Sequence, residues 1–332
     1  MLATMLTRRG LLAGTLTVVA RTLACASTPL AQALERIFRV VALSELPRFA
    51  PTEDRWRSAL RARGYVEGQN LMLDFRWGDG RPETIRKLAA DVAAGQPDVV
   101  LTTGTPAALA AKQATKTIPI VTISGDPIRE GLVAALSRPG GNVTGVFLPL
   151  DDLAAKRVQL LSELVPNLRT VAILSNPSHS IARSQVTSAE AAARARGITA
   201  HRVDLVRESD VERAFAQIVA ARADGVIVTQ EAVTFQAIPR LSMIAAKHRL
   251  PASHAYREFA EAGGLMSYGV TLQESMGLAA ISVDRILKGA NPAELPVQVP
   301  TKFELVLNMK TAKALGLTIP SLLLARADQV LE

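Results

Sequence analysis

One loop of this sequence combines residue types that suit the binding of an anion. The β-rich run at 98–104 ends in that loop, which is made of Thr103, Gly104, Thr105, Pro106 and Ala107. We expect Thr105 to cap the following helix and Pro106 to occupy its first turn, while Gly104 allows a close backbone approach. Unpaired N–H groups and the helix dipole at such a start favour an anion such as a carboxylate. An ordinary strand-to-helix turn has the same residues, so both interpretations stay open.

Other polar residues follow predicted strands in the same way. Asp126 comes after the run at 118–124, where it would accept a ligand ammonium group or cap a helix that begins near Ile128. Asn176 and Gln230 end two later strands, and each amide offers both a hydrogen-bond donor and an acceptor. Because ligands of open α/β sheets bind beyond the carboxyl ends of the strands, these side chains are candidate ligand contacts.

Four ring side chains are further candidates. Tyr256 and Tyr268 lie near the predicted edges of the two halves, where a ring either stacks on a ligand or serves as a core or hinge residue. His179 and His254 either face a cleft or are ordinary surface or core histidines. The sequence leaves these alternatives open.

Signatures of catalysis and of metal binding are absent from the sequence. None of the four histidines stands at the close spacing of paired metal ligands, and the single cysteine, Cys25, lies in the first 33 residues. There is no G-x-S-x-G elbow, no phosphate-binding P-loop and no complete G-x-G-x-x-G, and Gly78-Asp79-Gly80 is typical of a turn. We therefore expect a protein that is not an enzyme and that holds no metal and no cofactor.

The candidate residues are positioned by an alternation of short β-rich runs and helical segments. Strands are predicted at 37–43, 71–77, 98–104, 118–124, 170–176, 198–205, 224–230 and 250–254. Helices are predicted at 53–63, 83–94, 105–116, 152–164, 178–196, 208–221, 235–248, 272–288 and 309–315. Each strand is apolar on both faces, which is typical of parallel strands covered by helices. The pattern predicts the α/β class, with two Rossmann-like, doubly wound parallel-sheet lobes.

More than one segment joins the two halves. A Pro/Gly-rich stretch at 138–142 precedes an extended run at 143–150, which we expect to cross between the lobes. We expect further crossings at 263–269 and in the stretch from Pro292 to Pro300. The predicted first lobe is 34–147 with 270–298, and the predicted second lobe is 148–269 with 299–332. Such a multi-strand hinge lets lobes close over a ligand through small dihedral changes.

The first 33 residues are typical of a secretory signal. Arg8-Arg9 precedes an apolar run at 11–20, and Ala31-Gln32-Ala33 is a small-x-small cleavage site. The paired arginines also fit the twin-arginine export pattern. Cys25 is either lipid-modified or, as the sequence favours, removed with the signal. We therefore predict a signal peptide at 1–33 and a periplasmic protein.

The composition argues against two classes of protein. Hydrophobic residues make up 48% and charged residues 20%, which is ordinary for a globular protein and not for a disordered one. The formal net charge of +8 includes three arginines of the first 33 residues, and the other 35 basic residues are interspersed with 30 acidic ones. Because no block of like charge remains, we expect a solvated surface and no nucleic-acid partner.

Several stretches resemble one known family. They are TTGTPAALAAKQAT (102–115), SRPGGNVTG (137–145), REFAEAGGLMSYG (257–269), PTKFELVLNMKTAKALGL (300–317) and IPSLLLARADQVLE (319–332). Together they are similar to the tryptophan/tyrosine-type substrate-binding proteins of ABC transporters. The sequence departs from the family pattern at SNPSHS (175–180) and TQEAVTF (229–235).

The resemblance implies the periplasmic binding protein type I fold, two lobes with the ligand between them. It implies ligand contacts at the 103–107 loop, at Asp126, at Asn176 and around Tyr268. The expected function is that of an exported solute-binding protein of a bacterial ABC importer, which captures an amino acid or related carboxylate, aromatic ones included, by hinge closure. Its expected partners are this small molecule and the ABC transporter permease, and we expect a monomer. An exported ligand sensor for a membrane receptor or, less favoured, a cleft α/β enzyme would use the same lobes.

Overall fold

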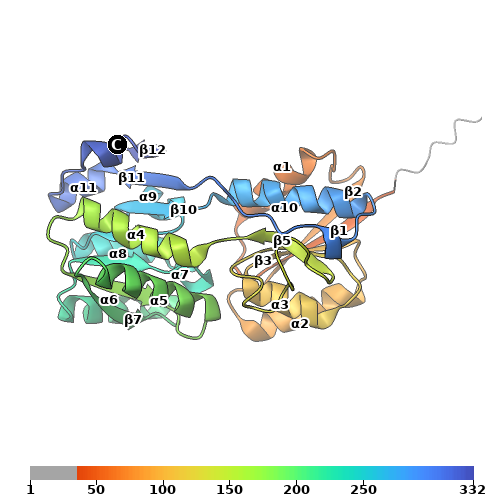
Figure 1. Cartoon of the computed structure of the whole chain (residues 1–332), viewed down its shortest axis with the longest axis horizontal. Coiled ribbons are helices and arrows are strands. Elements are labelled where there is room, and N and C mark those ends of the chain that lie inside the picture. The colour runs from red at the N-terminus through yellow and green to blue at the C-terminus, as the bar shows by residue number, and fades with distance from the viewer. Residues whose placement is uncertain (1–35) are drawn as a thin grey trace, which may run out of the picture. The chain divides into compact units, whose positions relative to one another are not determined.

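The computed structural model describes residues 36–332, and the part from Ile37 to Glu332 forms one compact unit. Two β-sheets with helices on both faces make two lobes within this unit, which confirms the predicted α/β class (Figure 1). The predicted export signal at 1–33, with Cys25, lies outside the described residues.

The first lobe is built on a five-stranded parallel sheet. Its strands, in the order β2-β1-β3-β4-β5, are β1 (Phe38–Ser44), β2 (Leu71–Trp77), β3 (Val99–Thr103), β4 (Ile120–Ser124) and β5 (Val143–Phe147). Its helices are α1 (Ala50–Arg61), α2 (Pro82–Ala94), α3 (Thr105–Ala114) and α10 (Leu272–Leu287), with a 3-10 turn at Pro292–Glu294. The helices α1 and α10 cover one face of the sheet, and α2 and α3 cover the other.

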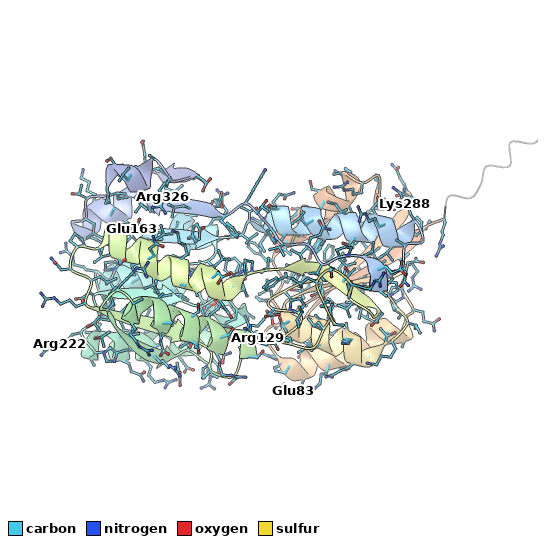
Figure 2. The ribbon with its side chains drawn as sticks, viewed as in Figure 1. Glu83, Arg129, Glu163, Arg222, Lys288 and Arg326 are labelled. Atoms are coloured by element: carbon cyan, nitrogen blue, oxygen red, sulfur yellow. The ribbon has the colours of Figure 1, made fainter. Side chains whose placement is uncertain are left out.

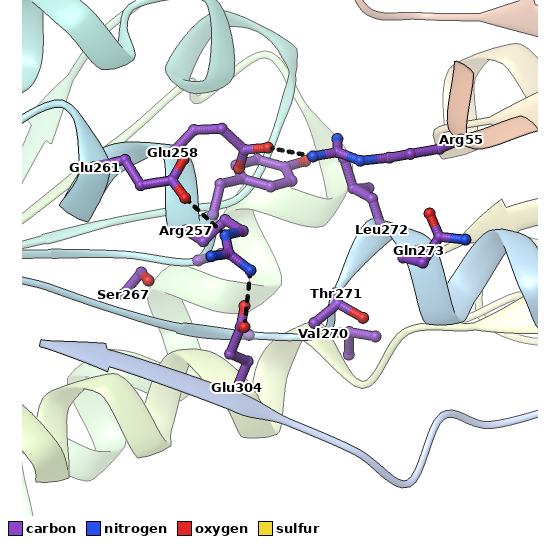
Figure 3. A pocket seen from close by; sticks show the side chains of 13 residues that line it. Arg55, Arg257, Glu258, Glu261, Ser267, Val270, Thr271, Leu272, Gln273 and Glu304 are labelled. Carbon is purple, nitrogen blue, oxygen red and sulfur yellow. Dashed lines mark hydrogen bonds and ion pairs between the residues drawn. The ribbon is translucent and has the colours of Figure 1, made fainter. Parts of the chain in front are cut away.

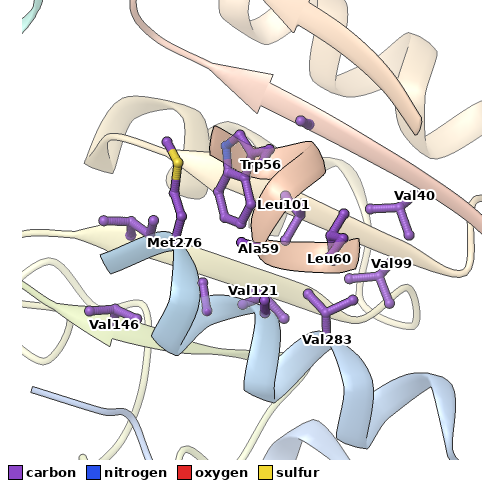
Figure 4. Close-up of a cluster of buried hydrophobic side chains, with 14 of the residues drawn as sticks. Val40, Trp56, Ala59, Leu60, Val99, Leu101, Val121, Val146, Met276 and Val283 are labelled. Carbon is purple, nitrogen blue, oxygen red and sulfur yellow. The ribbon is translucent and has the colours of Figure 1, made fainter. Parts of the chain in front are cut away.

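The core of this lobe shows why α10 belongs to it, although α10 comes late in the sequence. Met276, Ala279 and Val283 follow one face of α10 at helical spacing and are fully buried. They pack in one cluster with Trp56 and Leu60 of α1 and with the inner residues of the sheet (Figure 4). The sheet of the first lobe therefore has a complete apolar cover on this face.

The second lobe is built on a seven-stranded sheet in the order β12-β11-β10-β9-β8-β6-β7. Its strands are β6 (Thr170–Ser175), β7 (Thr199–Asp204), β8 (Gly225–Val228), β9 (Ala252–His254), β10 (Met266–Gly269), β11 (Glu304–Asn308) and β12 (Gln329–Leu331). Its helices are α4 (Leu150–Leu164), α5 (Ser180–Arg194), α6 (Val211–Ala220), α7 (Ala232–Gln236), α8 (Ile238–Lys247), α9 (Arg257–Glu261), α11 (Met309–Leu315) and α12 (Ser321–Leu324), with a 3-10 turn at Glu208–Asp210.

Three expectations about the strands are wrong in detail. The second sheet is not wholly parallel, because β11 runs antiparallel to β10. The reason is that β10 ends at the hinge, whereas β11 enters the lobe from the hinge. The edge strands β2 and β7 are not apolar on both faces, since one side of each meets solvent. Parts of the first two predicted crossings are themselves strands, β5 and β10.

Short segments connect the two lobes at three places (Figure 1). One leads from β5 to α4, one from β10 to α10, and one from the stretch beside β5 to β11. In that stretch Gln298 pairs with β5, because its N–H donates to the carbonyl of Gly145 (2.8 Å) and its carbonyl accepts from Phe147 (2.8 Å). Parallel sheets joined in this way turn the carboxyl ends of their central strands toward the same junction.

Candidate functional site

A small pocket lies where strand-end loops of the two lobes meet. The first lobe contributes Glu45 after β1, the start of α3 and the end of β4, and the second lobe contributes His179, Gln230 and Glu231. The pocket encloses about 40 Å³, which is room for one or two water molecules. An amino acid does not fit into that volume, so the lobes must part, or a lining side chain must move, before a ligand of that size enters.

Half of the sequence-predicted residues meet at this pocket. They are Thr103, Gly104, Thr105, Gln230 and Tyr256. Tyr256 is buried against Phe235, with 4.8 Å between the ring centroids, and burial raises the pKa of its hydroxyl. The strand-end rule therefore brings together residues from both lobes.

The expected role of Thr105 as a helix cap is wrong. The helix α3 begins at Thr105 itself, with Gly104 as the N-cap residue in a conformation with φ 95°. The Thr105 hydroxyl instead accepts a hydrogen bond from the N–H of Gly125 (3.3 Å), and it thereby ties two strand-end loops together. Pro106 does occupy the first turn, and Ala107 is fully buried in the lobe core, so neither lines the pocket.

Asp126 and Asn176 use their side chains locally and do not line the pocket. Asp126 accepts from the N–H groups of Ile128 and Arg129 (both 3.0 Å), which stabilises a turn where a helix was expected. Asn176 likewise accepts from the N–H of Ser178 (3.0 Å).

Two other candidate rings also lie outside the pocket. Tyr268 packs against Phe303 between the core clusters. His254 is fully buried behind Tyr256, and burial lowers the pKa of its imidazole to about 3, with a further contribution from Arg157. Of the alternatives that the sequence left open, the core role therefore applies to His254, and Tyr268 packs beside Phe303 and not at the pocket.

Sequence reasoning missed Glu45 and left His179 undecided, yet the two form an ion pair across the pocket. His179 Nε2 lies 3.2 Å from Glu45 Oε2, and both side chains are largely buried. The Glu45 carboxyl lies against Gly104, where an added methyl group would stand 2.2 Å from its Cδ. Glu45 directly follows β1, so the strand-end rule that selected the other residues applies to it as well.

The charges of the pocket are strongly coupled. Burial by itself would lower the pKa of His179, but the carboxylates of Glu45, Glu231 and Glu130 together raise it. Burial raises the pKa of Glu231 to about 7, although His179 and two backbone N–H groups act in the opposite direction. A proton therefore enters or leaves this group of side chains near neutral pH.

The pocket also holds polar atoms without a partner among the described residues. They are Ser124 Oγ, His179 Nδ1 and Gln230 Oε1, on side chains that are buried or nearly so. The apolar part of the wall consists of Leu46, Ile123, Leu148, Leu150, Ile181 and Leu272. Because buried polar groups are almost always hydrogen-bonded, this lining suits a small molecule that has both polar and apolar parts.

A buried amide network holds Gln230 in place. Gln185 accepts from the Gln230 N–H (2.8 Å) and donates to the Gln230 carbonyl (3.0 Å). Arg157, which is fully buried, donates to Gln185 and to the carbonyl of Tyr268 (both 3.3 Å). Burial lowers the pKa of Arg157 to about 10. The network fixes the backbone that presents the free Gln230 Oε1.

A second cavity of about 340 Å³ lies beside Tyr256 at the hinge (Figure 3). Its charged side chains pair with one another. Arg55 of α1 binds Glu258 of α9 (3.2 Å), and Arg257 binds Glu261 (2.9 Å) and Glu304 (3.0 Å). Arg55 Nη1 is the one buried polar side-chain atom of this lining without a partner among the described residues, compared with three such atoms in the strand-end pocket, so the cavity is the weaker candidate for ligand capture.

Further polar contacts hold the two lobes together. Arg129 of the first lobe lies at the junction in Figure 2 and binds Asp151 (2.8 Å) and Ser184 (3.0 Å) of the second. Glu130 accepts from the Ser180 hydroxyl (3.1 Å). With the Arg55 and His179 pairs, these contacts describe an arrangement in which the lobes are closed on each other.

The described residues contain neither a cluster of metal ligands nor a membrane-spanning helix. Between residues 36 and 332, no cluster of three or more His, Cys, Asp or Glu is placed to hold a metal ion. In the same part of the chain, no helix combines the length and the apolar character that a membrane span requires.

The similarity of this chain to known proteins covers almost all of the described residues. A family model described as ABC transporter substrate binding protein matches residues 40–331. A tyrosine-binding protein from Clostridioides difficile (strain R20291) is 27% identical over 278 residues, which are 83% of this chain and 79% of that protein.

Two solved structures superpose on this chain to different extents. The ABC domain in complex with L-Trp from Streptococcus pneumonia is 27% identical, with a TM-score of 0.81 over 89% of this chain and 100% of the other. The ligand-free, open structure of a substrate binding protein with adhesive properties from Clostridium difficile is 25% identical, with a TM-score of 0.65 over 89% and 99% of the two chains. At equal coverage of this chain, it superposes better on the complex with L-Trp than on the ligand-free, open structure.

Proposed function

Because the chain belongs to the ABC transporter substrate-binding protein family, we propose that it is the exported solute-binding protein of a bacterial ABC importer. The observation that carries the proposal is the pocket between Glu45 and Gly104 of one lobe and His179, Gln230 and Tyr256 of the other. A ligand held there touches both lobes, so its binding energy favours the closed arrangement over the open one. The importer permease would then recognise that closed surface.

Hinge closure is the proposed means of capture. It is supported by three short connections between the lobes and by ion pairs, such as Arg55 with Glu258, that break when the lobes part. It is also supported by the better superposition on the L-Trp complex than on the ligand-free, open structure. In this proposal the first lobe consists of 34–147 and 270–298, and the second of 148–269 and 299–332.

The proposed ligand is an amino acid or a related small molecule with an apolar side group. Relatives support this class, since one is named for tyrosine and another was solved with L-Trp. The apolar wall of the pocket around Ile123, Leu150 and Ile181 supports it as well. Secretion through the segment at 1–33, a periplasmic location and a monomeric state complete the proposal, in which the protein binds its ligand without transforming it.

A thermal-shift screen tests the capture function. The melting temperature of the purified mature protein is measured with L-tyrosine, L-tryptophan, other amino acids and small carboxylates, each at about 1 mM. A ligand that binds only the folded state, at a concentration of 100 times its Kd, stabilises the protein by about 2.7 kcal/mol and raises its melting temperature by several degrees. If no compound of the panel raises the melting temperature, the proposal is wrong.

A further inference from the structure

The acidic side chains of the strand-end pocket restrict the charge of the ligand that it can bind. Glu45 and Glu231 both line it, and His179 is the only basic side chain among its described lining residues. No Lys or Arg in that lining is available to pair with a ligand carboxylate. The electrostatics of the pocket therefore favour a cationic group over an anionic one.

The Glu45 carboxylate occupies the position at the start of α3 where the sequence predicted a bound anion. The Glu45 carboxyl stands beside Gly104, so close that even a methyl group on that residue would collide with it. A ligand carboxylate brought to the same helix start would meet this like charge at short range. Repulsion between two carboxylates excludes the ligand anion from the place where the loop sequence predicted it.

Among the described lining residues, His179 is the only side chain that offers a positively charged hydrogen-bond donor. Within the described part of the chain, the buried Gln230 Oε1 accepts no hydrogen bond, and the Glu45 carboxylate has His179 as its only ion-pair partner. An ammonium group carries three donors and no acceptor, so it matches acceptors that converge on one space. In this structure the His179 ring pairs with Glu45 and fills part of the space between these acceptors, which agrees with the small pocket volume of about 40 Å³.

We propose that Glu45 recognises the ammonium group of the ligand and that His179 is an internal stand-in for that group, paired with Glu45 until the ligand replaces it. The inference rests on the capture function proposed above and narrows its ligand to a primary amine with an apolar group, for which a carboxylate is dispensable. Glu231 and Glu130 also face His179 and favour its charged form. The stand-in therefore competes best at low pH and loses strength as the pH rises and the imidazole loses its proton.

Calorimetric titration with three indole compounds tests the charge requirement. L-Tryptophan and tryptamine carry the amine, whereas indole-3-propionate carries only the carboxylate. We expect the first two to bind the wild-type protein and the third to bind at least about 10-fold more weakly, because it offers no charge-assisted donor to Glu45. Glu45→Gln should weaken the binding of both amines by about 10- to 100-fold.

The stand-in role is tested by His179→Gln at two pH values. Removal of the competing imidazolium should tighten tryptamine binding by about 3-fold or more at pH 6, and the gain should be smaller at pH 8, where a smaller fraction of the imidazole is protonated. Glu83→Gln is the control, since this carboxylate is 80% exposed and does not line the pocket, and it should keep the affinity within about 2-fold. Circular dichroism confirms that each variant is folded.

The outcomes separate this inference from the capture function. Equal affinity of indole-3-propionate and L-tryptophan, or unchanged amine affinity in Glu45→Gln, overturns the ammonium site and leaves ligand capture intact. Weaker amine binding in His179→Gln makes His179 a ligand contact and overturns its role as a stand-in. If none of the three compounds binds the wild-type protein, both the amine site and an aromatic ligand are refuted.

Discussion

Glu231 makes the stability of this protein depend on pH in a predictable direction. The side chain is 3% exposed, and its pKa in the fold is about 7, compared with 4.5 for an ordinary glutamate. Folding therefore raises its proton affinity, so the native state binds more protons than the unfolded state between these values. The contribution of Glu231 to the free energy of unfolding is largest at low pH and falls by about 3 kcal/mol as the pH rises through this window.

Glu231→Gln removes this titration and keeps most of the shape. The two carboxylate oxygens accept from the N–H groups of Val233 (2.8 Å) and Thr234 (3.0 Å), and glutamine retains only one acceptor, which costs about 1 kcal/mol. At pH 5 the wild type has already lost about 1 kcal/mol of this contribution, so the variant should be about as stable as the wild type there and about 2 kcal/mol more stable at pH 8.

Urea unfolding at pH 5, 6, 7 and 8, followed by circular dichroism, measures this difference. Glu83→Gln is the control, because the Glu83 side chain is 80% exposed and its removal should leave the pH dependence of the wild type unchanged. Parallel stability curves for the wild type and Glu231→Gln across this range would refute the reasoning, since they would mean that Glu231 titrates alike in the folded and unfolded states.

Three further predictions concern packing and closure. Gly145→Ala should lower the free energy of unfolding in urea by about 3 kcal/mol or more, because the added methyl would stand 2.0 Å from the Thr122 carbonyl oxygen of β4. The control is Gly277→Ala in α10, where no atom lies within 4 Å of the added methyl, and this variant should be neutral or stabilising by up to about 1 kcal/mol. Trp56→Ala should lose about 3–5 kcal/mol, since the ring is 1% exposed in the first-lobe core; a loss below about 1 kcal/mol would contradict the packing described. Arg55→Ala breaks the ion pair with Glu258 and should shift the ligand-free protein toward the open form, seen as a larger radius of gyration in X-ray scattering; an unchanged radius would show that this pair does not hold the lobes.

The strand-end rule accounts for the part of the site that the sequence predicted. Thr103, Gly104, Thr105, Gln230 and Tyr256 all follow or end a parallel strand, and all line the pocket. A parallel sheet brings the carboxyl ends of its strands to one edge whatever the side chains are, so the positions follow from local sequence alone.

Local hydrogen bonds explain why Asp126 and Asn176, which the same rule selected, do not line the pocket. Each side chain accepts hydrogen bonds from backbone N–H groups two or three residues further on, so it turns back on its own loop and not toward a ligand. Nothing in the sequence ranks a turn of this kind against a ligand contact. The choice depends on where the neighbouring loops leave space, which is a property of the folded lobe.

By itself the sequence determined the α/β alternation, the two lobes and the edge of each sheet that carries the site, because hydrophobic periodicity and backbone hydrogen bonding act over a few residues. Only the tertiary structure decided which side chains meet across the lobes. Glu45 and His179 are 134 residues apart, and they pair because three short connections bring the two sheet edges face to face. The charge of the pocket is set by that meeting.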